Sequence, residues 1–372
     1  MIMDYMYKLK GFAKKNVVLC IAVLCAIITS FIIKPDKEYL TYFDFKTLTC
    51  LFCVLAVVCA LKNINFFRIL AQKIVQMFKN TRSGILALVY ITFIGSMLIA
   101  NDMALLTFLP LGYFVLSSTN KEKYMAFCFI MQNIAANLGG MLTPFGNPQN
   151  LYLYTKFEID NLEFMGIMFG PFIVSILLIT ILCIVAVKPE PFEIADEPIK
   201  LDKRRCVLYL ALFAWAIAIV FRGIPYGLGY IIPVILLFID RKALKMVDYP
   251  LLFTFVAFFI FAGNMARIDA VRDLFSMLLE KSTLIFSVLS CQVISNVPTA
   301  ILLSQFTDNY HELLIGVNIG GVGSIISSLA SLITLREFQK HYPKKIGSYL
   351  GEFSLVNIGF LVILVVVCAL FF

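Results

Sequence analysis

Two distant stretches of this sequence place the same polar residues within apolar surroundings. The first runs from Asn101 and Asp102 to Pro148 and contains an Asn-x-Gly-Gly sequence at residues 137–140. The second runs from Ser295 and Asn296 to Ser324 and contains Asn-x-Gly-Gly at residues 318–321. Carboxylate and amide oxygens are ligands for hard cations, and amide N–H groups donate hydrogen bonds to anions. These stretches therefore suggest reversible binding of small ions rather than catalysis, and no catalytic residue is predicted.

The candidate binding residues are the polar residues and one glycine of these stretches: Asn101, Asp102, Thr143, Gly146, Asn147, Ser295, Asn296, Thr299, Asn318 and Ser324. Asp102 is the one carboxylate expected deep in the apolar region, where an ionisable group usually has a function. It could bind Na⁺ directly or take up a proton. Two alternatives remain open: Asp102 lies at the edge of the apolar region, and the asparagines only join helices by hydrogen bonds.

Composition fixes the class of protein that must position these residues. The chain of 372 residues is 61% hydrophobic and 15% charged, with a mean hydropathy of +0.91. Apolar runs of about 20 residues, the length that crosses a bilayer, recur along it. The net charge is +8. The Lys and Arg residues that produce it cluster in particular loops, as expected for loops on the cytoplasmic side of a membrane. We therefore predict an integral membrane protein in contact with the lipid bilayer, and no nucleic-acid partner.

The predicted fold is an all-α polytopic membrane protein with about nine full crossings and two re-entrant hairpins. The apolar arms at residues 84–98 and 104–116 are short for a full span and flank Asn101, which favours a hairpin. A single long bent crossing is the alternative. Two discontinuous helices are expected. One covers residues 124–136, is broken at 139–148 and resumes at 151, and the other covers residues 311–335 with a break at Asn318 to Gly323.

The chain divides into four predicted units. Residues 1–46 form an N-terminal helix and outer loop, and residues 47–187 form a first transport repeat. Residues 188–249 form a cytoplasmic linker with two connecting helices at 206–221 and 226–239, and residues 250–372 form a second, inverted repeat. The basic loops all lie on the cytoplasmic side when three conditions hold: the N-terminus is cytoplasmic, the C-terminus is outside, and the two hairpins enter from opposite faces. We predict this topology. The cell membrane is the expected location.

These motifs resemble the ion transporter superfamily, which includes arsenite permeases, sodium–proton antiporters of the D type, citrate transporters and divalent-anion/sodium symporters. The resemblance covers most of residues 47–187 and 250–372. It implies an elevator-like or rocking carrier with cation sites at the hairpin tips and adjoining unwound helices. By position, the residues that would take these roles are Asn101, Thr143, Asn147, Asn296, Thr299 and Asn318. With the buried carboxylate included, the predicted Na⁺ ligands are Asn101, Asp102, Asn147, Asn296 and Asn318. A homodimer is expected as well.

One departure from the superfamily's pattern concerns the substrate. The dicarboxylate symporters carry Ser-Asn-Thr at both hairpin tips, whereas this chain has Asn101-Asp102-Met103 and Ser295-Asn296-Val297. The first tip is more similar to the arsenite permease and antiporter branch. Because Val297 stands where Asp102 stands in the first repeat, the two halves are expected to be unequal, with the first half more responsible for coupling.

Three classes of function remain after these arguments. The first is a secondary active transporter of a small organic or inorganic anion, coupled to Na⁺ or H⁺ and needing no other cofactor. The second is a Na⁺/H⁺ antiporter, which Asp102 suggests because one carboxylate can bind Na⁺ and H⁺ in turn. The third, a passive channel or an intramembrane enzyme, is disfavoured, since Asp102 has no second buried aspartate as a catalytic partner. The substrate, the coupling ion and the direction of transport stay open.

Overall fold

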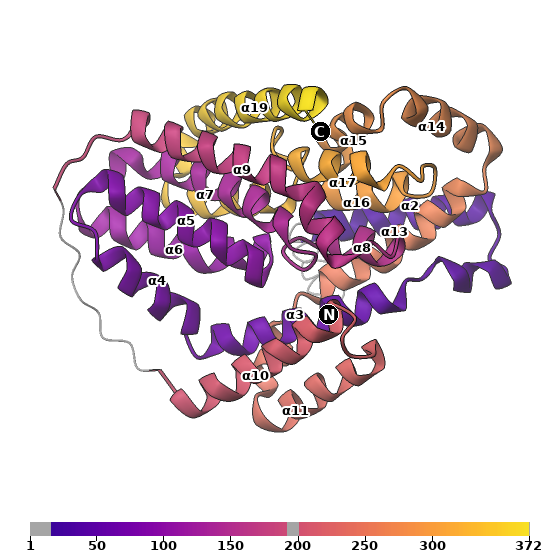
Figure 1. Cartoon of the computed structure of the whole chain (residues 1–372), viewed down its shortest axis with the longest axis horizontal. Helices are drawn as coiled ribbons and strands as arrows, with labels where there is room; N and C mark the ends of the chain where they lie inside the picture. The colour runs from indigo at the N-terminus through magenta and orange to yellow at the C-terminus, as the bar shows by residue number, and fades with distance from the viewer. Residues whose placement is uncertain (1–15, 192–200, 372) are drawn as a thin grey trace, which may run out of the picture.

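A computed structural model describes residues 16–191 and 201–371, which form helices and the loops between them (Figure 1). The predicted all-α polytopic class is confirmed. Six helices in this part of the chain are long and apolar enough to cross a membrane: Phe45–Asn63, Thr81–Ile99, Glu122–Leu142, Asn161–Ala186, Tyr249–Ala266 and Pro343–Phe371. The predicted number of nine crossings stays a prediction. The helix at Tyr226–Ile239 is shorter than the roughly 20 residues that a perpendicular span requires.

The first repeat, predicted at residues 47–187, contains five consecutive helices, namely α5 (Thr81–Ile99), α6 (Asn101–Ser118), α7 (Met125–Gly139), α8 (Pro148–Lys156) and α9 (Asn161–Ala186). The second, predicted at residues 250–372, contains α15 (Thr283–Ile294), α16 (Asn296–Leu303), α17 (Tyr310–Ile319), α18 (Leu329–His341) and α19 (Ile346–Phe371). Short 3₁₀ helices are η1 (Lys37–Tyr42), η2 (Glu122–Tyr124), η3 (Gly140–Leu142), η4 (Tyr226–Tyr230) and η5 (Pro343–Lys345). Both predicted discontinuous helices are present. We call residues 140–147, between α7 and α8, the first break, and residues 320–328, between α17 and α18, the second break.

Both predicted hairpins are also present, because α5 packs along α6 and α15 packs along α16. The arms of the first hairpin have 19 and 18 residues and are longer than the apolar runs from which they were predicted. The added turn of α5 is polar and starts at Asn80, whose side-chain oxygen accepts a hydrogen bond from Ser83 N at 3.0 Å. Such N-caps let a helix begin before its apolar run does.

The two hairpins start at opposite ends of α9. At the first residues of α9, Glu163 Oε1 accepts a hydrogen bond of 2.6 Å from Tyr310, next to the second hairpin. At its other end, Arg82 Nε of the first hairpin donates to Val187 O at 2.7 Å. A helix of 26 residues is about 39 Å long at 1.5 Å per residue. The hairpin bases are thus separated by the length of a membrane span, which supports inverted repeats.

Each repeat also packs against the other. The second arm α16 packs on α8 and the second arm α6 packs on α18, so each hairpin contacts the resumed half-helix of the opposite repeat. In Figure 1 α5, α6 and α7 lie in the left half, and α15 to α17 lie on the right above α8. Two further helices, α4 (Phe66–Gln76) and α14 (Asp269–Lys281), are amphipathic.

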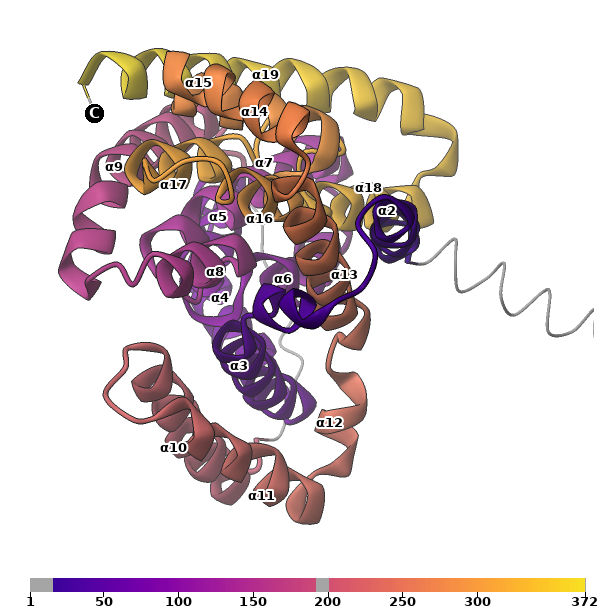
Figure 2. The ribbon, with the colours of Figure 1, turned by 90° about the vertical axis from the view of Figure 1, so that its right-hand side faces the viewer.

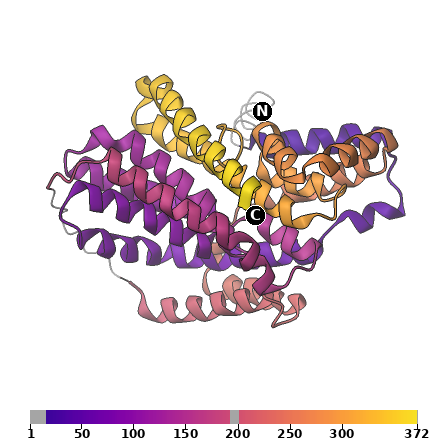
Figure 3. The same cartoon turned by 45° about the horizontal axis from the view of Figure 1, so that its top comes forward.

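The remaining helices lie around this pair of repeats. They are α2 (Val17–Ile32), α3 (Phe45–Asn63), α10 (Lys203–Val220), α11 (Ile231–Ile239), α12 (Arg241–Met246) and α13 (Tyr249–Ala266). Helix α3 is mostly buried and separates α10, α11 and α12 from the repeats (Figure 2). Helix α2 packs against α13. Helix α19 crosses the opposite side of the molecule from α10 and α11 (Figure 3).

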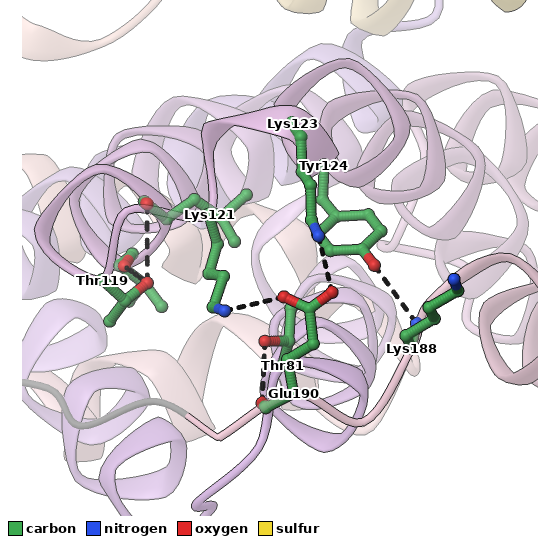
Figure 4. Close-up of polar contacts among 9 residues, drawn as sticks. Thr81, Thr119, Lys121, Lys123, Tyr124, Lys188 and Glu190 are labelled. Atoms are coloured by element: carbon green, nitrogen blue, oxygen red, sulfur yellow. Dashed lines mark hydrogen bonds and ion pairs between the residues drawn. The ribbon is translucent and has the colours of Figure 1, made fainter.

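A cluster of charges holds the chain that leaves α9 against the base of the first repeat (Figure 4). The Glu190 carboxylate pairs with Lys121 Nζ at 2.7 Å and Lys123 Nζ at 2.5 Å. The backbone oxygen of Glu190 accepts hydrogen bonds from Thr81 N at 2.7 Å and Thr81 Oγ1 at 3.0 Å. Hydrogen bonds from Lys121 and then Lys123 lower the pKa of Glu190 to about 2. The predicted linker therefore starts from a fixed point on the first repeat, and its residues 192–200 lie outside the described part of the chain.

Candidate functional site

The two hairpin tips have the same backbone conformation. Ala100 ends α5 and begins α6 with φ 65° and ψ 150°, and Ser295 does the same between α15 and α16 with φ 73° and ψ 158°. Residues with a side chain rarely adopt this region, and such strain concentrates at functional sites. The equivalent residues are therefore Ala100 with Ser295 and Asn101 with Asn296, so the sequence at the first tip is Ala-Asn-Asp. This places Asp102 opposite Val297, as the sequence suggests.

The tip asparagines make equivalent hydrogen bonds. Asn101 Oδ1 accepts from Asp102 N and Asn296 Oδ1 accepts from Val297 N, both at 2.9 Å. The backbone N–H of each asparagine donates to a backbone carbonyl of the break in its own repeat. Asn101 N donates to Gly146 O at 3.1 Å, and Asn296 N donates to Ser327 O at 2.9 Å. Each hairpin tip is thus fastened to the unwound part of its own discontinuous helix.

The two breaks have backbone hydrogen bonds at equivalent positions. Gly146 N donates to Thr143 O, and Ser327 N donates to Ser324 O, both at 3.2 Å. The following residues, Asn147 and Ser328, begin α8 and α18. In the first break, a Cβ added to Gly146 would lie 2.3 Å from Gly140 O, a distance that no side chain tolerates. The close approach of two backbone segments therefore requires glycine here.

Six buried amide side chains lie where the first break meets α17, and we call them the amide cluster: Asn101, Asn137, Asn147, Gln149, Asn150 and Asn318. Asn318 Oδ1 accepts from Asn147 Nδ2 at 3.1 Å and from Gln149 Nε2 at 3.4 Å. Asn318 Nδ2 donates to Asn150 Oδ1 at 2.6 Å. Asn318 belongs to the second repeat and the other three to the first, so these bonds join the two repeats directly.

The hairpin tips also reach this cluster. Asn101 Nδ2 donates to Asn137 Oδ1 at 3.3 Å. From the other side, Gly321 lies between Asn137 and Asn296, since a Cβ on Gly321 would be 3.4 Å from Asn137 Oδ1 and 3.1 Å from Asn296 Nδ2. The structure thus brings together four of the predicted site residues, namely Asn101, Asn147, Asn296 and Asn318.

Two oxygens of the cluster are buried without a donor. Asn147 Oδ1 and Gln149 Oε1 accept no hydrogen bond from any residue that the structure describes. A buried carbonyl oxygen without a partner costs free energy, and an amide oxygen is a suitable ligand for Na⁺ and other hard cations. The donor set of the cluster therefore fits a bound cation. Gln149 was not among the predicted residues, although its position two residues after Asn147 at the start of α8 was a usable signal.

The predicted hydroxyl groups support the backbone around the cluster. Thr143 Oγ1 donates to Met97 O at 2.7 Å, and Thr299 Oγ1 donates to Ser295 O at 2.8 Å. Ser324 is bonded through its N and Oγ to Gln292 at 2.8 and 3.1 Å, and Ser295 Oγ donates to Ser327 O at 3.2 Å. Each of these hydroxyls fixes a loop or a tip rather than pointing into the cluster.

Asp102 stands apart from the amide cluster. Its Oδ1 atom is buried and has no hydrogen-bond partner among the described residues. The neighbouring Asn101 side chain contacts Asn137, and successive residues of a helix point about 100° apart. The carboxylate is therefore a second, separate candidate for cation or proton binding.

Comparison with known proteins identifies the family. Residues 11–312 match the family model described as citrate transporter. This chain belongs to the citrate transporter family. The family match includes both hairpin tips and the first break and ends before Asn318. The predicted relation to the ion transporter superfamily is confirmed, and the chain is a membrane transporter rather than an enzyme.

Two relatives agree with membership of the citrate transporter family. An uncharacterized transporter of Methanocaldococcus jannaschii is 32% identical over 346 residues, which cover 91% of this chain and 93% of the relative. The inner membrane protein YbiR of Escherichia coli K12 is 27% identical over 307 residues, covering 81% and 82% of the two chains. Both similarities extend over most of the length of each protein.

Proposed function

We propose that this transporter is a secondary active carrier of a small anion, coupled to Na⁺ or H⁺. The observation that carries the proposal is the hydrogen bond between Asn147 and Asn318, which joins the two repeats. Beside it lie two buried oxygens that accept no hydrogen bond from the described part of the chain. A coupling cation bound there by Asn147 Oδ1 and Gln149 Oε1 would satisfy both oxygens. Discontinuous helices at the interface of inverted repeats are the usual place for substrate and coupling ion in such carriers.

The anion would be held by helix ends and by the coupling cation rather than by a basic side chain. Helices α6 and α16 begin at the tips, and α8 begins at Asn147 beside the amide cluster. Helix N-termini carry partial positive charge and favour anions. The family description makes citrate the first substrate to test, followed by dicarboxylates, arsenite and sulfate. Asp102 at the first tip, in place of a threonine, is the reason to include the inorganic anions.

Purified protein in proteoliposomes tests this proposal. Uptake of each anion is measured under an inward Na⁺ gradient, an inward proton gradient or no gradient. We expect one of the anions to accumulate only when a gradient is imposed, and Asn318→Ala to abolish the accumulation. Asn264→Ala is the matched control, because Asn264 is equally buried but lies on α13, bonded to Thr29 and Ser30 of α2. Failure of every anion to accumulate under both gradients contradicts the proposal.

The second candidate function is Na⁺/H⁺ antiport. Asp102 Oδ1 favours it, because this atom is buried and has no hydrogen-bond partner in residues 16–191 and 201–371. In everted vesicles with a pH-sensitive dye, Na⁺ would then drive proton movement in the absence of any anion. Asp102→Asn keeps the size of the side chain and removes its charge. Sodium-driven proton movement that survives this substitution would eliminate antiport through Asp102.

The proposed topology follows the distribution of basic residues. We place the N-terminus in the cytoplasm, the C-terminus outside and the protein in the cell membrane. The bases of the two hairpins lie at opposite ends of α9, which agrees with hairpins that enter from opposite faces. On this assignment the cluster around Glu190 lies on the cytoplasmic face. The four predicted units at 1–46, 47–187, 188–249 and 250–372 are kept as a proposal, as is a homodimer.

A further inference from the structure

A cavity of about 250 Å³ lies between α3, α4 and α6, away from the amide cluster. Its polar lining is Lys62, Asn65, Arg68, Gln72 and Thr107, and its apolar lining is Phe67, Leu106, Pro110, Leu111 and Phe114. Figure 1 shows α4 running beside α6 and joining α3 at a corner. Of the described residues that line it, two are cationic and none is acidic, so this part of the cavity attracts anions.

The corner between α3 and α4 brings these two cations together. Asn65 adopts the left-handed conformation, with φ 57°, immediately before α4. Asparagine is one of the few residues that tolerate it. The turn places Lys62, from the last turn of α3, and Arg68, from the first turn of α4, on one cavity.

Lys62 has an uncompensated charge. Its side chain is half-buried, and within residues 16–191 and 201–371 no carboxylate forms an ion pair with it. Removing an ammonium group from water without an opposite charge is costly. An anion bound in the cavity would recover part of this cost, so Lys62 is an independent indication of an anionic ligand.

The cavity follows one face of α6 toward the first hairpin tip. Leu106, Pro110 and Phe114 line it at four-residue intervals, and Asp102 is one turn before Leu106 on the same face. Pro110 has no N–H, so the Leu106 carbonyl lacks its usual helical donor and stays available as a polar group in the wall. The cavity therefore lies between the base of the hairpin and Asp102.

We propose that this cavity binds the carboxylate or phosphate group of an anion on the cytoplasmic side, at a site distinct from the amide cluster. Lys62 neutralises the group, Arg68 lies beside it, and the apolar wall of α6 contacts the rest of the ligand. The transported solute and the headgroup of an anionic lipid share this chemistry. Binding of the transported solute rests on the proposed function. Binding of a lipid headgroup agrees with the amphipathic character of α4, which lies beside the cavity.

Thiol labelling measures the charge of this cavity without requiring transport. Thr107→Cys is treated with a methanethiosulfonate that carries a sulfonate or a trimethylammonium group, in nanodiscs of zwitterionic lipid. Modification is followed at each cysteine by peptide mass spectrometry, and each rate is divided by that reagent's rate with free cysteine. We expect the normalised sulfonate rate to exceed the cationic rate roughly tenfold, and Lys62→Met to reduce this preference several-fold. Ile94→Cys is the control, because Ile94 is exposed on α5 but does not line the cavity, and no modification is expected there.

Two further arms identify the source of the anion. If added citrate slows labelling of the Thr107→Cys variant in zwitterionic nanodiscs, the cavity is a solute site. If nanodiscs of anionic lipid slow the same labelling without citrate, it is a headgroup site. Equal normalised rates, a preference that survives Lys62→Met, or no protection by either anion overturns the proposal.

Phe114→Cys replaces Thr107→Cys if the latter does not fold. A charge preference that persists in Asn318→Ala, in which uptake is lost, separates this site from the proposed function.

Discussion

The side chains of Asn147 and Asn318 meet across the interface of the two inverted repeats, with Asn147 Nδ2 3.1 Å from Asn318 Oδ1. Asn147 begins the second half of one discontinuous helix, and Asn318 ends the first half of the other. Both are almost fully buried. A rearrangement that separates the repeats must break this bond, whereas a motion of both repeats together leaves it intact.

The coupling between these two asparagines is measurable by a double-mutant cycle. Asn318→Ala removes the acceptor of Asn147 and Gln149 and the donor to Asn150. Each buried group left without a partner costs about 1–3 kcal/mol of stability. We expect Asn147→Ala and Asn318→Ala to be clearly non-additive in thermal unfolding and each to lower anion uptake at least about tenfold, since one interaction energy is shared. If the effects of the two substitutions on stability are strictly additive in the double variant, the contact between Asn147 and Asn318 does not contribute to stability.

Relief of backbone strain at a hairpin tip should stabilise the protein. Ala100 has φ 65° and ψ 150°, a region in which only glycine is comfortable and which costs other residues about 1–3 kcal/mol. We expect Ala100→Gly to raise the midpoint of thermal unfolding, because this relief exceeds the backbone entropy that glycine adds to the unfolded state. Ala104→Gly, four residues later in α6, is the control and should lower it by the usual cost of glycine in a helix, about 1 kcal/mol. A loss of stability in Ala100→Gly would contradict the strain argument.

The sequence predicted most of the fold because the decisive signals are local. Apolar length and the Asn- and Gly-containing interruptions indicated both hairpins and both discontinuous helices, and the charges of the loops indicated that the hairpins enter from opposite faces. Helix ends were less accurate, since the caps at residues such as Asn80 extend helices beyond their apolar runs. The helix predicted at residues 226–239 is present at Tyr226–Ile239, but composition indicates only its apolar character, so the number of crossings stays a prediction.

The candidate site was only partly predictable, because contacts between distant residues set its composition. Asn147 and Asn318 were expected from their positions in the repeats, but Gln149 was not, since its proximity to Asn318 depends on how α8 and α17 pack. Gln292 was also missed. It supports the second break through hydrogen bonds to Gly320 O at 2.8 Å and from Ser324 N at 2.8 Å. Nothing in its surrounding apolar sequence distinguishes it from a residue that only packs.

The ion pairs of Glu190 should make stability depend on pH in a defined range. Lys121 and Lys123 lower the pKa of Glu190 from 4.5 to about 2 in the folded protein. A carboxylate with a lowered pKa stabilises the folded state above its unfolded pKa, and this contribution disappears as the pH falls toward the folded value. The difference in unfolding free energy between wild type and Glu190→Gln should therefore be constant above about pH 5 and shrink between pH 4.5 and about 2. Glu122→Gln, on the same face but outside these ion pairs, is the control, and a difference that does not change with pH would contradict the assignment.

The cation response should depend on the space that Gly140 leaves for Asn147. A Cβ on Gly140 would lie 2.4 Å from Asn147 Oδ1 and 2.7 Å from Gly146 O, so Gly140→Ala must displace the oxygen that we propose as a cation ligand. We expect this variant to lose the rise in unfolding temperature that Na⁺ causes in the wild type, since that rise grows with the logarithm of ion concentration over Kd. Gly166→Ala is the matched control, because Gly166 lies within α9 with no neighbouring atom within 4 Å of an added Cβ. This control should keep the full Na⁺ response and gain up to about 1 kcal/mol from the better helix propensity of alanine. A Na⁺ response retained in Gly140→Ala would place the coupling ion elsewhere, with the carboxylate of Asp102 as the remaining candidate.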